Sequence, residues 1–288
     1  MSAGLVKQLE TLAELRAMVS EWKRAGLTVG FVPTMGNLHA GHLSLVKLAQ
    51  QRCDRVVVSL FVNPLQFGPN EDFDRYPRTL TEDIEKLNAL QLNAVYLPSV
   101  EEMYPCGLAQ TVVFIPGDLT NVLEGASRPG HFDGVSTVVC KLFNMVQPDV
   151  AVFGQKDYQQ SLVIQKMVRD LALPIEVVVA PISRDKDGLA LSSRNQYLSV
   201  EQRKVAPKLY VALQDIALAI ASGNQHFNVL TEVAKERLIE EGFDSVDYLQ
   251  VCDAVTLQAV DEASQAVVVL AVVRLGTTRL LDNQVVVI

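Results

Sequence analysis

The hydrophobic positions of this chain fall into short continuous runs, and stretches with helical spacing of apolar residues separate most of them. Continuous apolar strands that alternate with helices are typical of a parallel sheet covered by helices on both faces. Ligands of such sheets bind beyond the carboxyl ends of the strands, so the loops there are the candidates for a site. The predicted strands are 27–33, 55–62, 94–97, 150–153 and 175–181, with a small β excursion at 111–115, and the predicted helices are 12–22, 43–51, 82–91, 135–146 and 159–171.

The pattern changes after the last of these strands. A polar stretch leads into Ser199-Val200-Glu201-Gln202, which has capping-box form and predicts a long helix to about Ala221. A second helix is predicted over 228–240, and strands are predicted over 245–251, 266–274 and 279–287. Helices followed by antiparallel-looking strands are typical of an α+β fold. We therefore expect an α/β domain over residues 1–182 and a smaller C-terminal α+β domain over residues 183–288.

Composition and charge argue against several classes of protein. The chain of 288 residues has a net charge of −8, which repels nucleic acid and anionic membranes, and it shows no local basic patch. The longest apolar run, 266–273, is too short to span a bilayer, and the N-terminal residues carry no continuous apolar segment of signal-peptide type. The four cysteines form no Cys-x-x-Cys pair, as is typical of reduced thiols. We therefore expect a cytoplasmic protein without nucleic-acid or membrane partners.

The most informative segment is Met35–His42, between a predicted strand and a predicted helix. It contains glycine for a tight turn, and it places His39 and His42 where a helix N-terminus points its N–H groups at a ligand. This arrangement suits a phosphate chain. Two other interpretations remain open, since the histidines could simply cap the helix or could bind a metal. A metal site would need a third strong ligand, and the remaining histidines, His131 and His226, have no partner cluster in the sequence.

Other strand ends carry further candidates. Lys156 follows the strand 150–153 and could reach a phosphate, while Asp157 beside it could be only a helix N-cap. Asn63 and Gln66 follow the strand 55–62, and their amides could hydrogen-bond hydroxyls or a carboxylate, although a turn built around a proline explains the same residues.

Three loops have open interpretations. The polar segment 191–195 holds two serines and an arginine that could close over phosphates, or it is an ordinary surface loop. The long charged loop 68–81 is either a lid or a solvated surface loop. The glycine-rich segment 127–134 either lines the pocket or only connects two elements.

Five segments resemble, together and in this order, the pantothenate synthetase (pantoate–β-alanine ligase) family, which has an HIGH-type motif. A single one of them would be weak, since His-x-Gly-His occurs across a wide superfamily of nucleotidyltransferases and class I aminoacyl-tRNA synthetases. The segments are PTMGNLHAGH (33–42), FVNPLQF (61–67), EGASRPGHF (124–132), GQKDYQQ (154–160) and DGLALSSRN (187–195).

The resemblance implies a Rossmann-like ATP-binding domain, a C-terminal lid domain and a homodimer. It also implies a reaction in which (R)-pantoate and β-alanine condense with ATP, accompanied by Mg²⁺, to give pantothenate, AMP and diphosphate through a pantoyl adenylate. His42, with His39 and Lys156, would be catalytic. Gln66 would bind pantoate and β-alanine, and Gln160 would bind pantoate. The implied ATP-binding residues are Met35, Gly36, Asn37, Leu38, His39, Ala40, Gly41, His42, Gly154, Gln155, Lys156, Asp157, Ser183, Leu191, Ser192, Ser193 and Arg194.

Two positions depart from the family pattern, because Gln155 stands where many relatives have Glu and Leu191 where many have Met. We expect little change, since both would contact nucleotide through backbone or apolar surface. The resemblance names no protein ligand for Mg²⁺.

Three alternative functions share parts of this pattern. A nucleotidyltransferase would use the same turn with a phosphate acceptor, a tRNA-charging fragment would need to bind nucleic acid, and a nucleotide sensor would bind ATP without releasing AMP.

Overall fold

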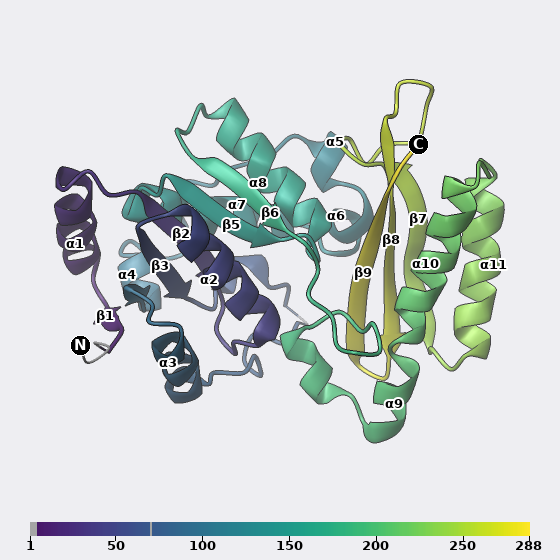
Figure 1. The fold of residues 1–288 in the computed structure, drawn as a ribbon, viewed down its shortest axis with the longest axis horizontal. Helices are drawn as coiled ribbons and strands as arrows, with labels where there is room; N and C mark the ends of the chain where they lie inside the picture. Colours follow the sequence, from purple (N-terminus) through teal and green to yellow (C-terminus); the bar gives the residue numbers. More distant parts are fainter. Residues whose placement is uncertain (1–4, 70) are drawn as a thin grey trace. The chain divides into compact units, whose positions relative to one another are not determined.

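The computed structural model describes residues 5–69 and 71–288, and the chain divides into two compact units. The first unit comprises the chain up to Gln155 together with Gln160–Pro181. The second comprises Lys156–Gln159 and Ile182–Ile288. Figure 1 shows the elements of both. The short segment Lys156–Gln159 thus groups with the second unit, although it includes the first two residues of a helix whose remainder belongs to the first unit.

The first unit is built on a six-stranded sheet in the order β1-β4-β3-β2-β5-β6, and every pairing is parallel. The predicted parallel α/β sheet is therefore confirmed. Strand β2 lies between β3 and β5, so the strand order reverses there, and such a switch point is where α/β sheets open a crevice for ligands. The strands are β1 (Lys7–Leu9), β2 (Val29–Thr34), β3 (Arg55–Leu60), β4 (Ala94–Tyr96), β5 (Val150–Gly154) and β6 (Glu176–Ala180).

Helices cover both faces of this sheet. On one face, Val46 of α2 and Leu87 of α3 share a buried cluster with Val58. On the other, Phe143 of α7 packs edge-on against Phe31 and Phe153. The helices are α1 (Leu12–Arg24), α2 (Ala40–Arg52), α3 (Leu80–Ala89), α4 (Val100–Met103), α5 (Gly117–Thr120), α6 (Leu123–Ser127), α7 (His131–Val146) and α8 (Tyr158–Asp170), with a 3₁₀ turn η1 (Pro64–Gln66).

Three details of the first unit differ from the prediction. Strand β1 was not predicted, because it has three residues and buries only Leu9, which is too little pattern to detect. The segment 111–115 was predicted as a β excursion, and this is wrong: it forms no ladder, and its Val113 N–H donates instead to the Thr137 hydroxyl (2.9 Å). Helix α7 begins at His131 and not at Val135, because Gly130, with φ of 80°, turns the chain directly into the helix.

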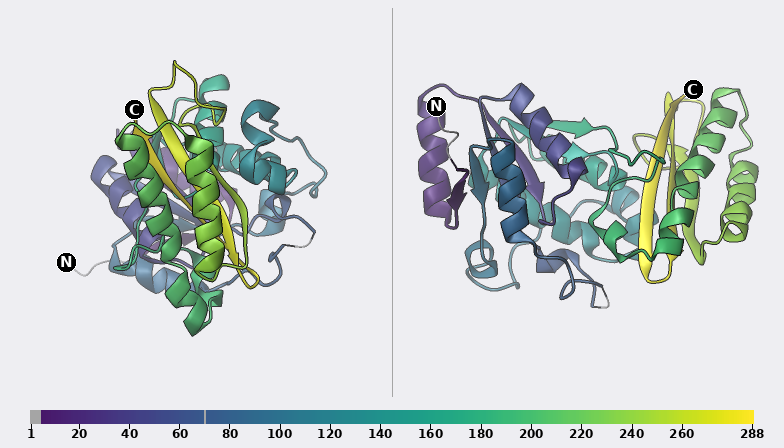
Figure 2. Two further views of the ribbon diagram at one scale, coloured as in Figure 1. Left: turned by 90° about the vertical axis from the view of Figure 1, so that its right-hand side faces the viewer. Right: turned by 60° about the horizontal axis from the view of Figure 1, so that its bottom comes forward.

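The second unit has a three-stranded antiparallel sheet in the order β7-β8-β9, and helices α10 and α11 pack on it around one apolar core. Figure 2 shows these two helices side by side against the strands. The predicted α+β architecture is confirmed. Its elements are η2 (Ser193–Tyr197), α9 (Val200–Val205), α10 (Lys208–Ala221), α11 (Phe227–Glu240), β7 (Ser245–Asp253), β8 (Ala266–Leu275) and β9 (Thr278–Val287).

The long helix predicted from Ser199 is two helices. Its capping box is confirmed, with the Ser199 hydroxyl accepting from Gln202 N–H (3.2 Å) and the Gln202 side chain accepting from Ser199 N–H (2.9 Å). The helix ends at Val205, and α10 begins after Pro207. Proline lacks the N–H that a continuous helix needs and is favoured where a new helix begins, so it explains the break.

Candidate functional site

The turn between β2 and α2 is held in one conformation by its neighbours. The hydroxyl of Thr34 donates to the Ser59 carbonyl of β3 (2.9 Å) and accepts from Gly36 N–H (3.2 Å). Gly36 and Asn37 have φ of 83° and 50°, in the left-handed region that glycine and asparagine tolerate best. The predicted tight turn is confirmed, and it joins the carboxyl ends of two adjacent strands.

Asp83 of α3 completes this turn, although its pattern in the sequence gave no sign of such a role. It is 1% exposed, and its two carboxylate oxygens accept from the main-chain N–H groups of Asn37 (2.8 Å) and Leu38 (2.7 Å). Lys86 lies 3.8 Å from the same carboxylate and donates to the Leu38 carbonyl (2.7 Å). An acid in the first turn of a helix is ordinary, and its partners here are 45 and 46 residues away, so only the fold reveals it.

His39 and His42 both cap helix α2. Nδ1 of His39 accepts from Gly41 N–H (3.2 Å), and Nδ1 of His42 accepts from His39 N–H (3.4 Å). The capping interpretation is thus confirmed. A ring nitrogen that accepts a hydrogen bond carries no proton, so each neutral imidazole has its proton on Nε2. The rings stack with centroids 4.1 Å apart. Both histidines are therefore organised as Nε2–H donors at the start of a helix.

Asn63 and Gln66 have different environments after β3. Asn63 is 1% exposed and fully engaged: its Oδ1 accepts from Tyr104 Oη (2.7 Å) and Leu65 N–H (3.3 Å), and its Nδ2 donates to Gly134 O (3.1 Å). Nδ2 also donates to Oε1 of Gln66 (3.2 Å). Gln66 donates through Nε2 to the Met35 sulfur (3.0 Å). Asn63 is therefore a structural amide, and Gln66 lies beside the turn that carries the histidines.

His131 has a set of partners that the sequence did not predict. Its Nδ1 lies 2.8 Å from the Gln66 carbonyl oxygen, and its Nε2 lies 3.0 Å from a guanidinium nitrogen of Arg128. Arg128 also pairs bidentately with Glu71 (2.7 and 2.5 Å). Burial, with the Arg128 charge beside it, lowers the pKa of His131 to about 4. His131 is therefore neutral at physiological pH.

The hairpin over 183–191 organises the second unit's candidate residues. Leu191 N–H donates to the Ser183 carbonyl (2.9 Å), and Arg184 forms an antiparallel β-bridge with Ala190. The polar stretch that follows β6 is thus an ordered hairpin at this point. Ser192 follows directly, and its hydroxyl accepts from Arg194 N–H (3.3 Å) at the start of η2.

A buried ion pair fastens this hairpin to β9. The Arg184 guanidinium donates to both carboxylate oxygens of Asp282 (2.5 and 2.9 Å) and stacks on the Tyr210 ring at 3.7 Å. Asp282 is 3% exposed; burial raises its pKa, and the Arg184 hydrogen bond opposes that shift. Arg203 adds contacts to two acidic residues of the turn, Asp185 (2.9 Å) and Asp187 (2.6 Å). The hairpin is thereby held at both its base and its tip.

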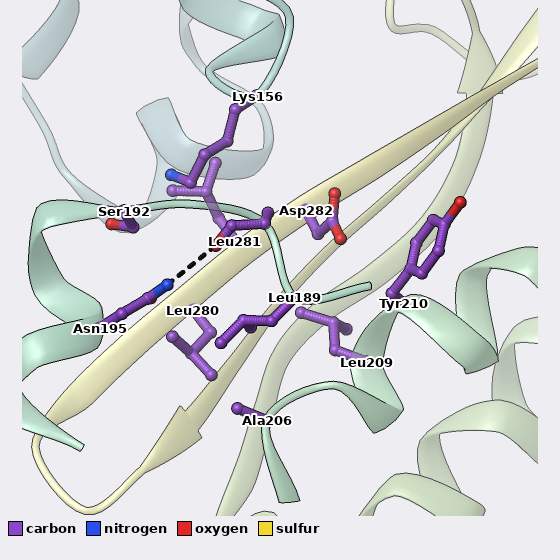
Figure 3. Close-up of a pocket in the computed structure, with 11 residues that line it drawn as sticks. Lys156, Leu189, Ser192, Asn195, Ala206, Leu209, Tyr210, Leu280, Leu281 and Asp282 are labelled. Carbon is purple, nitrogen blue, oxygen red and sulfur yellow. Dashed lines mark hydrogen bonds between the residues drawn. The ribbon is translucent and has the colours of Figure 1, made fainter. Parts of the chain in front are cut away.

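Lys156 lies in the same unit. Its carbonyl accepts from Asn283 Nδ2 (3.0 Å), and its ammonium lies 3.8 Å from an Asp157 carboxylate oxygen. Figure 3 shows Lys156, Ser192 and Asp282 around one pocket of this unit. The structure therefore brings the predicted lysine together with the predicted serine loop.

The predicted site residues are distributed over both units. The first unit holds Met35–His42 after β2, Gln66 after β3, and Gly154 and Gln155 at the end of β5, as well as Gln160 in the first turn of α8. The second unit holds Lys156, Asp157, Ser183 and Leu191–Arg194. Apart from Gln160, the first group follows the carboxyl ends of β2, β3 and β5, where parallel sheets bind ligands.

Over residues 5–69 and 71–288, no group of three His, Cys, Asp or Glu side chains is placed to hold a metal ion. In the same described part of the chain, no helix has both the length and the apolar character needed to cross a bilayer.

The chain is similar to known proteins over nearly its whole length. The family model described as pantoate-beta-alanine ligase matches residues 7–285. Pantothenate synthetase of Hydrogenovibrio crunogenus is 60% identical over 275 residues, covering 96% of this chain and 97% of that protein. The enzyme of the same name from Ectopseudomonas mendocina is 55% identical over 276 residues, covering 96% of each.

Two solved structures share this fold over 97% of the chain. Crystalline pantothenate synthetase from Thermus thermophilus superposes with a TM-score of 0.90 at 46% identity, covering 97% of this chain and 99% of that one. Pantoate-beta-alanine ligase from Francisella tularensis, complexed with beta-gamma ATP and beta-alanine, gives a TM-score of 0.82 at 32% identity and 97% coverage of both.

Proposed function

The chain belongs to the pantoate–β-alanine ligase family and is a pantothenate-forming ligase, and we propose that it works through an ATP-dependent pantoyl adenylate. The observation that carries this proposal is the family match over residues 7–285, which includes every candidate site residue. A relative has been crystallised with an ATP compound and β-alanine, which supports both as ligands of this chain. Family membership also sets aside a tRNA-charging fragment, a dinucleotide-forming enzyme and a non-catalytic sensor.

In the first proposed step, a carboxylate oxygen of pantoate attacks the α-phosphorus of ATP, and the bond from that phosphorus to the bridging oxygen of diphosphate breaks. A carboxylate is ionised at neutral pH, so no general base is required. The requirement is to bring two anions together and to stabilise the charge on the leaving diphosphate. We assign this task to His42 and His39, whose Nε2–H groups lie at a helix N-terminus, and to the ammonium of Lys156.

In the second step, the amine of β-alanine attacks the acyl carbonyl, AMP leaves, and the amine loses a proton. Gln66 would bind both acids, since its amide offers a donor and an acceptor beside the His39–His42 turn. Gln160 would bind pantoate. We assign ATP contacts to the remaining predicted residues of both units, from Met35–His42, Gly154–Asp157, Ser183 and Leu191–Arg194.

We further propose that Mg²⁺ arrives with ATP and is held mainly by phosphate oxygens and water. This follows from the preference of Mg²⁺ for such ligands. A homodimer remains our proposal from the resemblance, and a cytoplasmic location remains our proposal from the charge and cysteine pattern of the chain.

The test is to incubate the purified chain with ATP, Mg²⁺, pantoate and β-alanine and to measure AMP. We expect AMP formation to require both acids, and pantoate alone to support ATP–diphosphate exchange. His42→Ala should slow that exchange by roughly a hundredfold, the scale for losing one donor to a transition state. His226→Ala is the matched control, because that histidine is exposed and belongs to no candidate group. Exchange at the wild-type rate in His42→Ala would reject the assigned role, and AMP formation without pantoate would reject the proposed reaction.

A further inference from the structure

The segment Arg128–Gly134 packs directly against the 3₁₀ turn that carries Gln66. A β-carbon added to Gly134 would lie 2.3 Å from the Leu65 carbonyl oxygen, so only glycine allows helix α7 this close to η1. The Gly134 carbonyl also accepts from the Asn63 amide (3.1 Å). The segment left open in the sequence as a pocket wall or a connection is therefore the support of η1.

Intrinsic hydrogen bonds hold η1 only loosely. Gln66 N–H reaches the Asn63 carbonyl at 3.5 Å, and Phe67 N–H reaches the Pro64 carbonyl at 3.4 Å. Both are long for N–H···O bonds, which are usually 2.7–3.2 Å. The conformation of Gln66 consequently depends on contacts from outside the turn.

His131 supplies the shortest of these contacts. A carbonyl can only accept, so Nδ1 of His131 carries the proton in its 2.8 Å bond to the Gln66 carbonyl. A guanidinium can only donate, so Nε2 accepts from Arg128 (3.0 Å). The two partners thus select one neutral tautomer, and burial lowers the pKa of this ring to about 4, which preserves it at physiological pH.

Arg128 is in turn held by acidic groups. Its guanidinium pairs with Glu71 in two short contacts (2.7 and 2.5 Å) and lies 3.6 Å from Glu124. It also donates to the Gln66 carbonyl at 3.4 Å. The charged loop that contains Glu71 is therefore fastened to the same carbonyl through Arg128.

The side chain of Gln66 has the opposite character, because its own contacts are weak. Its Nε2 donates to a thioether sulfur, which is a poor acceptor, and its Oε1 accepts one amide N–H at 3.2 Å. A substrate hydroxyl or carboxylate could replace the sulfur at little cost. A firmly held main chain with an exchangeable side-chain contact is what a preorganised binding amide requires.

We propose that His131 is a positioning residue, which holds the main-chain carbonyl of Gln66 so that the side-chain amide is presented to the carboxylic acid substrates. This inference rests on the proposed binding role of Gln66. His131 does not touch substrate; its effect passes through the η1 backbone. Arg128 contributes by fixing the tautomer of the ring.

Two substitutions remove the two hydrogen bonds of the His131 ring one at a time. The amide nitrogen of Asn occupies the place of Nδ1, so His131→Asn keeps the donor to Gln66. In His131→Gln the amide reaches the place of Nε2, so the bond to Arg128 is kept and the donor to Gln66 is lost. We expect His131→Gln to raise the KM for pantoate roughly tenfold, the effect of one hydrogen bond, with the KM for ATP unchanged. His131→Asn should stay within about twofold of the parent chain.

A double-mutant cycle with Gln66→Ala tests the route of the effect. If His131 acts through the Gln66 amide, then His131→Gln adds nothing to the pantoate KM of Gln66→Ala. Multiplying effects in the double variant would overturn the inference, as would a His131→Asn variant as impaired as His131→Gln.

The same measurements distinguish a failure of the binding role of Gln66 from a failure of the positioning role of His131. An unchanged pantoate KM in Gln66→Ala rejects the binding role of Gln66 and this inference with it. A raised KM in Gln66→Ala beside a normal KM in His131→Gln rejects only the positioning role.

Discussion

Replacing His131 with asparagine should make the folded protein less sensitive to acid. The ring has an ordinary pKa of 6.5, and burial lowers it to about 4 in the folded chain. Between pH 4 and pH 6.5 the ring is therefore mostly protonated in the unfolded state and mostly neutral in the folded state. The contribution of this ring to the free energy of unfolding is fully present above pH 6.5 and is lost as the pH falls toward 4. Below pH 4 the ring causes no further loss.

The size of the effect follows from the two pKa values. This pKa shift contributes at most about 3 kcal/mol to the free energy of unfolding, and about 2 kcal/mol of that contribution is already lost at pH 5 relative to pH 8. Asparagine does not titrate and keeps the bond to Gln66, so the variant should lack this part of the pH dependence. The ring is partly buried, so solvent screening reduces the figure only modestly.

Urea unfolding of the parent chain and the variant at pH 8 and pH 5 measures this quantity, with a fluorescence probe confined to the first unit. The difference between the two pH values should be about 2 kcal/mol smaller in the variant. His226→Asn, at an exposed position of the second unit, is the control and should show the parent pH dependence. A ring titration by NMR that gives His131 a midpoint near 6.5, or equal pH dependence in parent and variant, would refute the reasoning.

Two further substitutions test the packing around the candidate site. Gly134→Ala should destabilise the first unit by about 3 kcal/mol or more, since its new methyl group would meet the Leu65 backbone at 2.3 Å and η1 would have to move. Thermal unfolding measures this, and Gly154→Ala, at a glycine with open space around it and no positive φ, calibrates the cost of losing a glycine alone. An equal effect at both glycines would contradict the packing argument. Asp83→Ala should lower the free energy of unfolding by about 2–5 kcal/mol, because the buried N–H groups of Asn37 and Leu38 lose a charged acceptor. The same substitution should slow pantoate-dependent ATP–diphosphate exchange. Exchange at the parent rate would show that the turn keeps its shape without the carboxylate.

Local pattern was sufficient to predict the architecture. Strands β2, β3, β4, β5 and β6 are short, mainly apolar runs, and their alternation with helices is typical of a parallel sheet buried on both faces. The tight turn between β2 and α2 was likewise predicted from its own residues, although the same residues left capping, phosphate binding and metal binding open as roles of His39 and His42. These features depend on neighbours within a few positions, which a single sequence displays.

Features that depend on distant partners could not be predicted in this way. Asp83 looks like an ordinary first-turn acid until the fold brings it to Asn37 and Leu38, and His131 looks solitary until α7 packs on η1. The short strand β1 is recognised only from its pairing with β4, whose residues are about ninety positions away in the sequence. Chain neighbours specify elements through periodicity and steric preference, whereas a buried polar group takes its role, its tautomer and its pKa from whichever groups the folded backbone places against it.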